Sequence, residues 1–311
     1  MTEIEVFHSY CADRRRIGID GFEAHQFDHL MRYTSRDPGV DGLVAYANLR
    51  TGFEVAQIQE QIAYFQAVHQ DLEWKVYEFD RPSNLQKLLE SQSFVPGEME
   101  VFMIYSLQGH GSIPKYEKSP WDVRMVRDEK GVRDVVAVQE QVLGQNFEWL
   151  VGQLARRLRT DSSGLSVYCA YADGQPIGTG WTDFPSGSDF PELHGGAVVK
   201  AWRGRKVYSD LYRCRLAEAI DRSYDFLVVD ASPLSRPILE KLGFRPVCTT
   251  IPMRFKDKGE RQVAPGADFE DAPLDDGGGR VDGGAAPLFR SSSLQTGDHH
   301  SGQSPRRTCS L

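Results

Sequence analysis

A strand–helix–strand pattern occurs twice in this chain, at a constant offset of 150 residues. The strand-like run at 74–79 corresponds to the run at 224–229, and helical apolar spacing precedes both. The segments that follow, 80–96 and 230–246, agree without a gap. Their five identities are Asp80/Asp230, Leu89/Leu239, Glu90/Glu240, Phe94/Phe244 and Pro96/Pro246. An internal duplication of an α/β unit explains this agreement, and chance similarity between two α/β units is the alternative.

The second copy has a readable order of elements. The expected strands lie near 121–127, 193–200, 226–229 and 249–254, and the expected helices cover 132–143, 149–158, 207–220 and 236–241. A hairpin is expected over 165–182, because two β-rich runs meet at Asp173-Gly174 and Asp-Gly is typical of tight hairpin turns. Strands and helices alternating in this way predict a layered α/β fold.

Composition sets the limits on function. The chain has 311 residues, 40% of them hydrophobic, and a formal net charge of −8, so a broad electrostatic grip on nucleic acid is not expected. No apolar run approaches the roughly 20 residues of a membrane helix, and the acidic N-terminus does not resemble a signal peptide. Five scattered cysteines without a C-x-x-C pair favour reduced thiols over a metal site. We therefore expect a cytoplasmic protein without metal, nucleic-acid partner or membrane contact.

The organisation along the chain follows two changes in composition. A polar segment rich in glycine and proline, 109–120, separates two apolar runs and marks a domain boundary. From about Lys256 onward Gly, Asp, Ser and Pro dominate, and such a segment buries too little apolar area to offset the entropy cost of ordering. The predicted division is a first domain at 1–115, a second at 116–256 and a disordered tail at 257–311.

One segment of the second copy carries a chemical signal. A strand ends at Ala197–Val199, the basic loop Arg203-Gly204-Arg205-Lys206 follows, and a helix begins near Val207. The first N–H groups of a helix have no intrahelical partner and the helix dipole favours negative charge there, so this arrangement predicts an anion site. An ordinary solvated turn with three cations is the alternative.

The sequence GGAVVKAWRGRKVYSDL, 195–211, resembles motif A of the GNAT N-acetyltransferase superfamily, whose loop reads R/Q-x-x-G-x-G/A. SRPILEKLGFRP, 235–246, resembles the family's closing motif B. The resemblance covers about 121–255 and implies a mixed-sheet GNAT-like fold. Together with the repeat, it implies a tandem protein whose N-terminal copy is degenerate. It further implies transfer of an acetyl group from acetyl-CoA to a small-molecule or peptide amine, by direct attack within a ternary complex.

The resemblance also assigns roles to residues. Backbone groups of Val198 and Val199 would pair with the pantetheine arm, and the Val198 N–H would polarise the thioester carbonyl as an oxyanion donor. The pyrophosphate would lie on the N–H groups of the loop and first helical turn, which are Arg203, Gly204, Arg205, Lys206, Val207 and Tyr208. Glu192 opens the motif A strand and is the leading candidate for the base that deprotonates the amine. Asp183, Asp189 and His194 are weaker candidates.

Two departures from the family motifs leave a second function open. Lys206 and Tyr208 stand where motif A has its two small residues, so neither glycine is present. Leu239 stands where many members carry a tyrosine as the acid for the departing thiolate. The acid is therefore unassigned; Tyr208 and Tyr212 are near in sequence, but a helix tyrosine more often serves packing. In the first copy the phosphate loop corresponds to 53–58, which holds one acid and no cation, so that copy is expected to lack a cofactor site. The alternative to an acetyltransferase is therefore a catalytically degenerate GNAT-like protein with a binding or regulatory role.

Overall fold

The computed structural model describes residues 2–37, 39–108 and 119–256. Most of the expected boundary segment and all of the predicted tail, 257–311, lie outside the described residues. The first half contains α1 Glu3–Ile17, β1 Phe22–Gln26, β2 Met31–Ser35, β3 Gly42–Ala45, α2 Glu54–Ala67, β4 Leu72–Tyr77, α3 Leu85–Ser91, β5 Val95–Pro96 and β6 Glu100–Ser106. The second half contains β7 Asp122–Met125, α4 Glu129–Leu143, α5 Glu148–Thr160, β8 Leu165–Ala172, β9 Gln175–Asp183, β10 Glu192–Val198, η1 Lys200–Trp202, α6 Val207–Asp221, β11 Phe226–Ala231, α7 Arg236–Lys241 and β12 Arg245–Phe255.

The repeat expected from the sequence is visible in the order of elements. In the first half α2, β4, α3 and β6 follow one another, and in the second half α6, β11, α7 and β12 do the same. The expected elements of the second half all form, with bounds that differ from the expected ones by a few residues. The sequence patterns therefore identified a mixed α/β fold that is built twice.

The two halves exchange their last strands. In the described part of the chain, the main path of one sheet runs β1-β2-β3-β4-β12-β6-β11-β10-β9-β8-β7. The last strand of the second half, β12, pairs with β4 of the first half, and β6 of the first half pairs with β11 of the second. Each half thus completes the sheet of the other. The predicted domains 1–115 and 116–256 share this sheet, and their independence stays a prediction.

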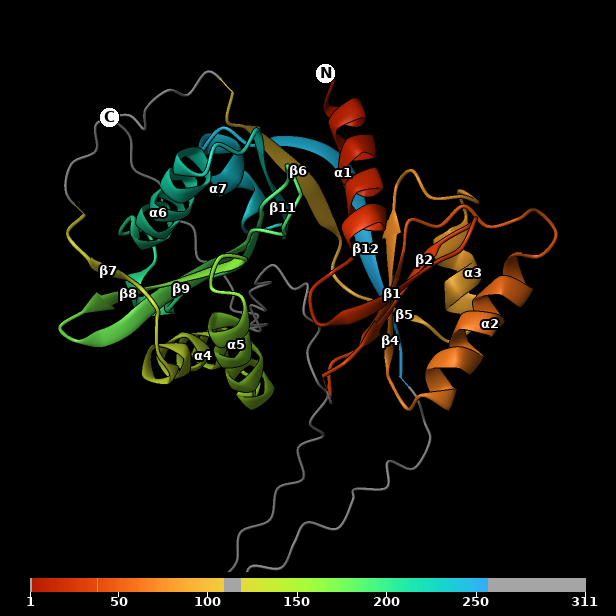
Figure 1. Cartoon of the computed structure of the whole chain (residues 1–311), viewed down its shortest axis with the longest axis horizontal. Helices are drawn as coiled ribbons and strands as arrows, with labels where there is room; N and C mark the ends of the chain where they lie inside the picture. Colours follow the sequence, from red (N-terminus) through yellow and green to blue (C-terminus); the bar gives the residue numbers. More distant parts are fainter. Residues whose placement is uncertain (1, 38, 109–118, 257–311) are drawn as a thin grey trace, which may run out of the picture.

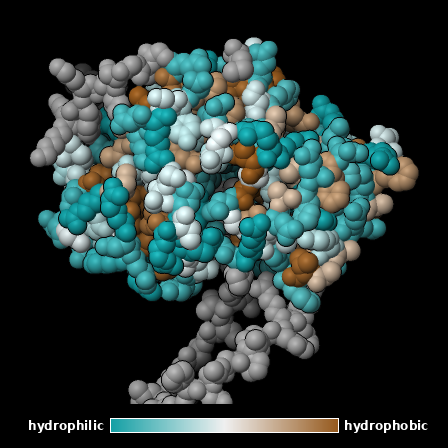
Figure 2. Space-filling view, in the orientation of Figure 1, coloured by the Kyte–Doolittle hydropathy of each residue, from teal (hydrophilic) through white to brown (hydrophobic). Residues whose placement is uncertain are grey.

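Helices cover both faces of the sheet (Figure 1). Alternate residues of β6 serve opposite faces: Phe102 and Ile104 pack in the cluster beneath α1, whereas Val101 and Met103 pack in the cluster beneath α6 and α7. Helices α4 and α5 bury their apolar side chains against β8. No described helix is both long enough and apolar enough to cross a membrane. The face shown in Figure 2 is mainly hydrophilic.

Glycines in the β8–β9 hairpin have specific structural causes. Asp173 and Gly174 adopt φ angles of 50° and 79°, the left-handed conformation that a two-residue hairpin turn requires. A Cβ atom on Gly178 would lie 2.8 Å from Val207, and one on Gly180 would lie 2.8 Å from the guanidinium of Arg215. These glycines let α6 pack closely on β9, which places the first turn of α6 beside the end of β10.

Candidate functional site

Strands β10 and β11 separate soon after they meet. Their parallel register consists of a single pair in the described structure, Glu192 with Val228. Further along, β10 stays paired with β9, but its register shifts between His194 and Ala197. Gly195 makes this bulge possible, because its φ is 57° and a Cβ atom there would lie 1.7 Å from the Trp181 ring. A gap therefore opens in the sheet toward Val198.

The backbone at the end of β10 presents one edge to this gap. The Val199 N–H donates to the Ile177 carbonyl on the β9 side, at 3.0 Å. Successive residues of a strand direct their N–H groups to opposite edges, so the Val198 N–H faces the gap. The Val198 carbonyl accepts a hydrogen bond from Arg203 Nε at 3.0 Å. Of the two valines predicted to pair with pantetheine, Val198 is thus the one that offers an N–H to the gap.

A cavity of about 340 Å³ occupies the mouth of the gap. Six of the predicted cofactor residues line it, namely Val198, Arg203, Gly204, Lys206, Val207 and Tyr208. Val199 and Arg205 do not line it. The opposite wall includes Leu234 and Ile238, which are large apolar side chains left exposed to solvent. An apolar wall facing a polar strand edge suits a chain that combines amides with methylene groups.

The loop before α6 has a strained backbone. Lys206 is the N-cap of α6 and adopts φ 66° and ψ 5°, a left-handed conformation that glycine accepts more readily than lysine. Arg205 lies over the Trp202 ring at 5.0 Å, and its carbonyl accepts from Trp121 Nε1 at 2.9 Å. Both arginines and Lys206 are exposed. The loop therefore presents three cations beside the first N–H groups of a helix.

The Tyr208 hydroxyl lies beside the strand at the gap. A Cβ atom on Gly196 would lie 2.9 Å from the Tyr208 ring and 3.4 Å from its hydroxyl oxygen. Burial raises the pKa of Tyr208 above its ordinary value, while the charge of Arg215 acts in the opposite direction. Leu239, at the family's usual acid position, is fully buried in the apolar cluster of α6 and α7. The sequence left the acid unassigned and favoured a packing role for Tyr208; the structure places the Tyr208 ring beside Gly196 at the gap.

Glu192, the predicted base, lies in a buried ion pair. Its carboxylate accepts from Arg14 Nη2 at 2.9 Å and from the Tyr10 hydroxyl at 3.3 Å. Burial raises the pKa of Glu192, but the charges of His194 and Arg14 outweigh burial and hold it below its ordinary value. A carboxylate with two donors and a lowered pKa is a weak acceptor for the proton of an ammonium group. Its assignment as base stays a prediction.

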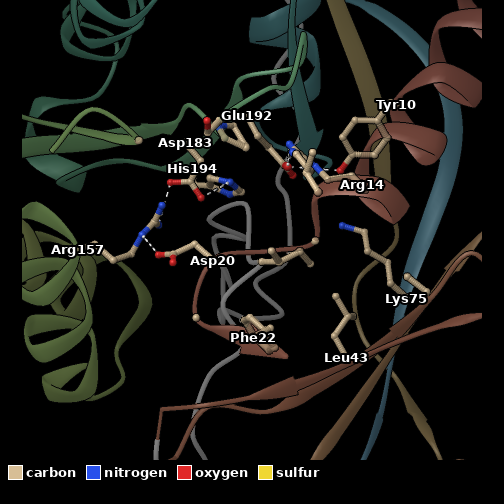
Figure 3. A pocket seen from close by; sticks show the side chains of 18 of the residues that line it. Tyr10, Arg14, Asp20, Phe22, Leu43, Lys75, Arg157, Asp183, Glu192 and His194 are labelled. Carbon is tan, nitrogen blue, oxygen red and sulfur yellow. Dashed lines mark hydrogen bonds and ion pairs between the residues drawn. The ribbon is translucent and has the colours of Figure 1, made fainter. Parts of the chain in front are cut away.

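His194 lies two residues further along β10. Its Nε2 is 3.6 Å from Asp183 Oδ2, and its ring stacks on Trp181 with centroids 6.4 Å apart. Arg157 contacts Asp183 at 2.9 Å and Asp20 at 2.8 Å, which joins the second half to the loop after α1 (Figure 3). Asp189, the remaining candidate base, is exposed. It does not line the cavity that Asp183 and His194 share.

The equivalent gap in the first half is closed. Strands β3 and β4 pair along all four residues of β3. Beyond the strand the chain continues this pairing, because Leu49 N–H donates to Arg81 O and Arg81 N–H donates to Ala47 O, each at 2.9 Å. This geometry supports the expectation that the first copy has no cofactor site.

The chain resembles known proteins in its fold and not in its sequence. No family model matches the sequence, and no curated protein is significantly similar to it. Among solved structures, a GCN5-related N-acetyltransferase from Kribbella flavida shares 13% identity with a TM-score of 0.57, over 83% of this chain and 96% of its own. One from Sphaerobacter thermophilus shares 13% identity with a TM-score of 0.55, over 86% and 96%. A tandem GNAT protein from the clavulanic acid biosynthesis pathway shares 10% identity with a TM-score of 0.50, over 80% and 88%.

The chain has a tandem GNAT fold. The resemblance seen in the two sequence motifs is confirmed at the level of the fold, and so is the duplication. In the tandem GNAT fold of this chain, the second copy keeps an open strand pair and the first copy has closed it. Identities of 10–14% in such neighbours carry the fold and leave the reaction to be argued from the site.

Proposed function

We propose that this protein is an N-acetyltransferase that transfers the acetyl group of acetyl-CoA to an amine by direct attack within a ternary complex. The observation that carries this proposal is the gap between β10 and β11, which exposes the Val198 N–H beside the basic start of α6. An unpaired strand edge, an apolar opposite wall and a cationic helix N-terminus match the amides, methylene groups and phosphates of coenzyme A.

Each part of the site has a distinct task in this reaction. The first N–H groups of α6 and the cations Arg203, Arg205 and Lys206 would hold the pyrophosphate. The Val198 edge would hold the pantetheine amides, and its N–H would stabilise the negative charge that develops on the thioester oxygen when the amine attacks.

The acid for the leaving thiolate is assigned to Tyr208. Its hydroxyl lies beside Gly196 at the gap, and burial keeps it protonated at neutral pH. As the new C–N bond forms and the C–S bond breaks, the electron pair passes to sulfur, and Tyr208 donates the proton that neutralises it. Solvent takes up the proton that the attacking nitrogen loses and restores the tyrosine proton.

Release of free thiol tests the proposal. Acetyl-CoA is incubated with the full chain and a panel of small amines, polyamines and peptide N-termini, and thiol is measured with time. Amine-dependent thiol release, reduced by Tyr208→Phe with little change in acetyl-CoA affinity, supports an acetyltransferase. Saturable binding without thiol release from any amine supports the degenerate binding protein instead, which the strained Lys206 favours.

A further inference from the structure

A second cavity, of about 360 Å³, lies between the two halves on the other side of β10 from α6 (Figure 3). The loop after α1 and strands β3 and β4 form its wall in the first half, while α5, β9 and β10 form its wall in the second. Glu192 and His194 of β10 line it. It therefore adjoins the same strand as the proposed acetyl-CoA cleft and is built jointly by the two copies.

The wall contributed by the first half is largely apolar. Phe22, Leu43, Ala45, Tyr46 and Tyr77 line it, and all five are buried. Tyr46 and Tyr77 stack with ring centroids 5.5 Å apart, so this wall is a fixed aromatic surface. Such a surface binds the hydrocarbon part of a ligand.

Two of the cations that line the cavity are neutralised by buried carboxylates. Arg14 pairs with Glu192, and Lys75 pairs with Asp230 beneath α1. All four side chains are at most 7% exposed. Because both charges are compensated, neither cation favours an anionic ligand.

The part of the cavity around the imidazole, built from both halves, has more carboxylates than cations. Arg157 is shared by Asp20 and Asp183, so one positive charge faces two negative ones. The Asp183 side chain is 24% exposed, and its second oxygen faces His194. Arg36 and Asp161 are the remaining charged groups that line the cavity, and the negative charge of Asp161 also acts on Arg157. A cationic group is therefore favoured beside Asp183.

We propose that this cavity binds the acceptor, a primary ammonium with an aliphatic or aromatic body, and that His194 removes its proton. This inference rests on the proposed acetyl transfer. The ammonium lies at Asp183 and His194, and the body lies on the aromatic wall of the first half. His194 is two residues from Gly196, which lies beside Tyr208 at the gap, on the same strand.

Each proton in this reaction has a donor and an acceptor. The imidazole of His194, which lies beside Asp183, accepts a proton from the ammonium and becomes an imidazolium. The neutral amine then forms the C–N bond while the C–S bond breaks, the second proton on the nitrogen passes to solvent, and the thiolate takes its proton from Tyr208. The imidazolium and the tyrosine exchange protons with solvent before the next turnover.

Matched acceptors test the ligand class. Phenethylamine has an ammonium and an apolar body, phenylalanine adds a carboxylate to the same body, and ethylamine lacks the body. At saturating acetyl-CoA, kcat/KM for phenethylamine is expected to exceed that for either other compound by at least tenfold. Equal or higher kcat/KM for phenylalanine or ethylamine would overturn the assignment of the cavity. Calorimetric titration with acetyl-CoA alone reports the other cleft, so failure of the proposed function is seen separately.

Two carboxylates near the opposite ends of β9 provide a matched pair of variants. Asp183→Asn is expected to raise KM for phenethylamine at least tenfold, with acetyl-CoA affinity unchanged. Asp173→Asn, in the exposed hairpin turn and outside the cavity, is expected to leave both quantities unchanged. Similar KM values for the two variants, with native circular dichroism, would contradict a cationic ligand at Asp183.

The role of His194 is tested with an acceptor that needs no base. His194→Gln is expected to lower kcat for phenethylamine by about 10²-fold or more. With methoxyamine, which is unprotonated at neutral pH, the same variant is expected to keep at least a third of the wild-type kcat. Equal losses with both acceptors would show that His194 serves the structure of the site and does not act as base.

Discussion

The guanidinium of Arg14, on the first helix, lies 2.9 Å from the carboxylate of Glu192 on β10, and both side chains are at most 7% exposed. This ion pair joins α1 of the first half to the strand that carries the proposed site. The Arg14 guanidinium also donates to the Phe190 carbonyl at 3.0 Å. The first half thus holds β10 in place from the face opposite α6.

Removal of one partner of this pair is expected to destabilise the fold strongly. Arg14→Leu removes the ion-pair partner of the buried Glu192 carboxylate and leaves the Tyr10 hydroxyl as a donor to it, so the free energy of unfolding should fall by about 3–5 kcal/mol. In the double variant Arg14→Leu/Glu192→Leu no charge is stranded, so most of this loss should be recovered. Urea unfolding of both variants measures the two values. A double variant no more stable than the single one would contradict a compensated buried pair.

Lys206 is expected to impose strain on the loop. With φ at 66°, Lys206→Gly should raise the free energy of unfolding by about 1 kcal/mol relative to Lys206→Ala, because alanine removes the ammonium but keeps the Cβ atom. If the ammonium contacts phosphate, both variants should bind acetyl-CoA more weakly than wild type. Thermal unfolding and calorimetry on the pair separate strain from charge, and equal stability of Gly and Ala variants would refute the strain.

The two loop arginines are expected to contribute to binding and little to folding. Each of Arg203→Ala and Arg205→Ala should weaken acetyl-CoA binding by about 1.5–3 kcal/mol, the range for hydrogen bonds that involve charged groups. Both residues are exposed, so the unfolding free energy should change little. The pantetheine fragment, which lacks the pyrophosphate, should bind wild type and variants alike. Unchanged acetyl-CoA affinity would show that this loop does not hold phosphate.

One equivalent of acetyl-CoA is expected to bind per chain. In the second half β10 and β11 pair at one position, whereas in the first half the pairing of β3 and β4 continues through Asn48 and Arg81. A closed strand pair offers no backbone N–H to pantetheine. Calorimetric titration of the full chain measures the stoichiometry directly, and two equivalents would mean that the first copy has a site elsewhere.

Local sequence patterns carried most of the fold and part of the site. Helix α7 was predicted with its observed bounds, since a proline in its first turn and a glycine two residues after Lys241 delimit it. The basic loop was placed correctly at the start of α6 because its residues are consecutive in the chain. The strand exchange was not predicted: β12 pairs with β4 across more than 170 residues, and the repeat fits swapped and unswapped strands equally well.

Long-range pairing also explains what was missed at the site. Glu192 was singled out by its place on the strand, but its partner Arg14 is 178 residues away and lies on a helix that no pattern had identified. His194 and Asp183 are diagonal neighbours on the paired strands β10 and β9, and periodicity does not reveal which strands pair. Sequence spacing thus located the basic loop at the start of α6, whereas the charged partners of Glu192 and His194 came together only through the tertiary fold.

Asp80 is expected to make the fold less stable as the pH rises from about 4 to 7. Burial raises its pKa to about 7, although backbone N–H groups of Tyr77 and Ala47 oppose this shift. In the unfolded chain an aspartate ionises near pH 3.9, so between these values the native state binds more protons than the unfolded state. The contribution of the protonated carboxyl to the free energy of unfolding is therefore complete below about pH 4. It is lost as the pH approaches 7, at a rate of at most about 1.4 kcal/mol per pH unit.

Asp80→Asn isolates this effect, because the amide oxygen can still accept from the Tyr77 N–H, which lies 3.0 Å from the carboxylate, and carries no charge. Urea unfolding of wild type and variant at pH 5, 6, 7 and 8 gives the difference in unfolding free energy at each pH. The free energy of unfolding of the variant should rise relative to that of wild type from pH 5 to 7. The difference should be nearly constant from pH 7 to 8, where native Asp80 also becomes ionised. Parallel stability curves over the whole range would mean that Asp80 titrates alike in both states and that its burial carries no charge penalty.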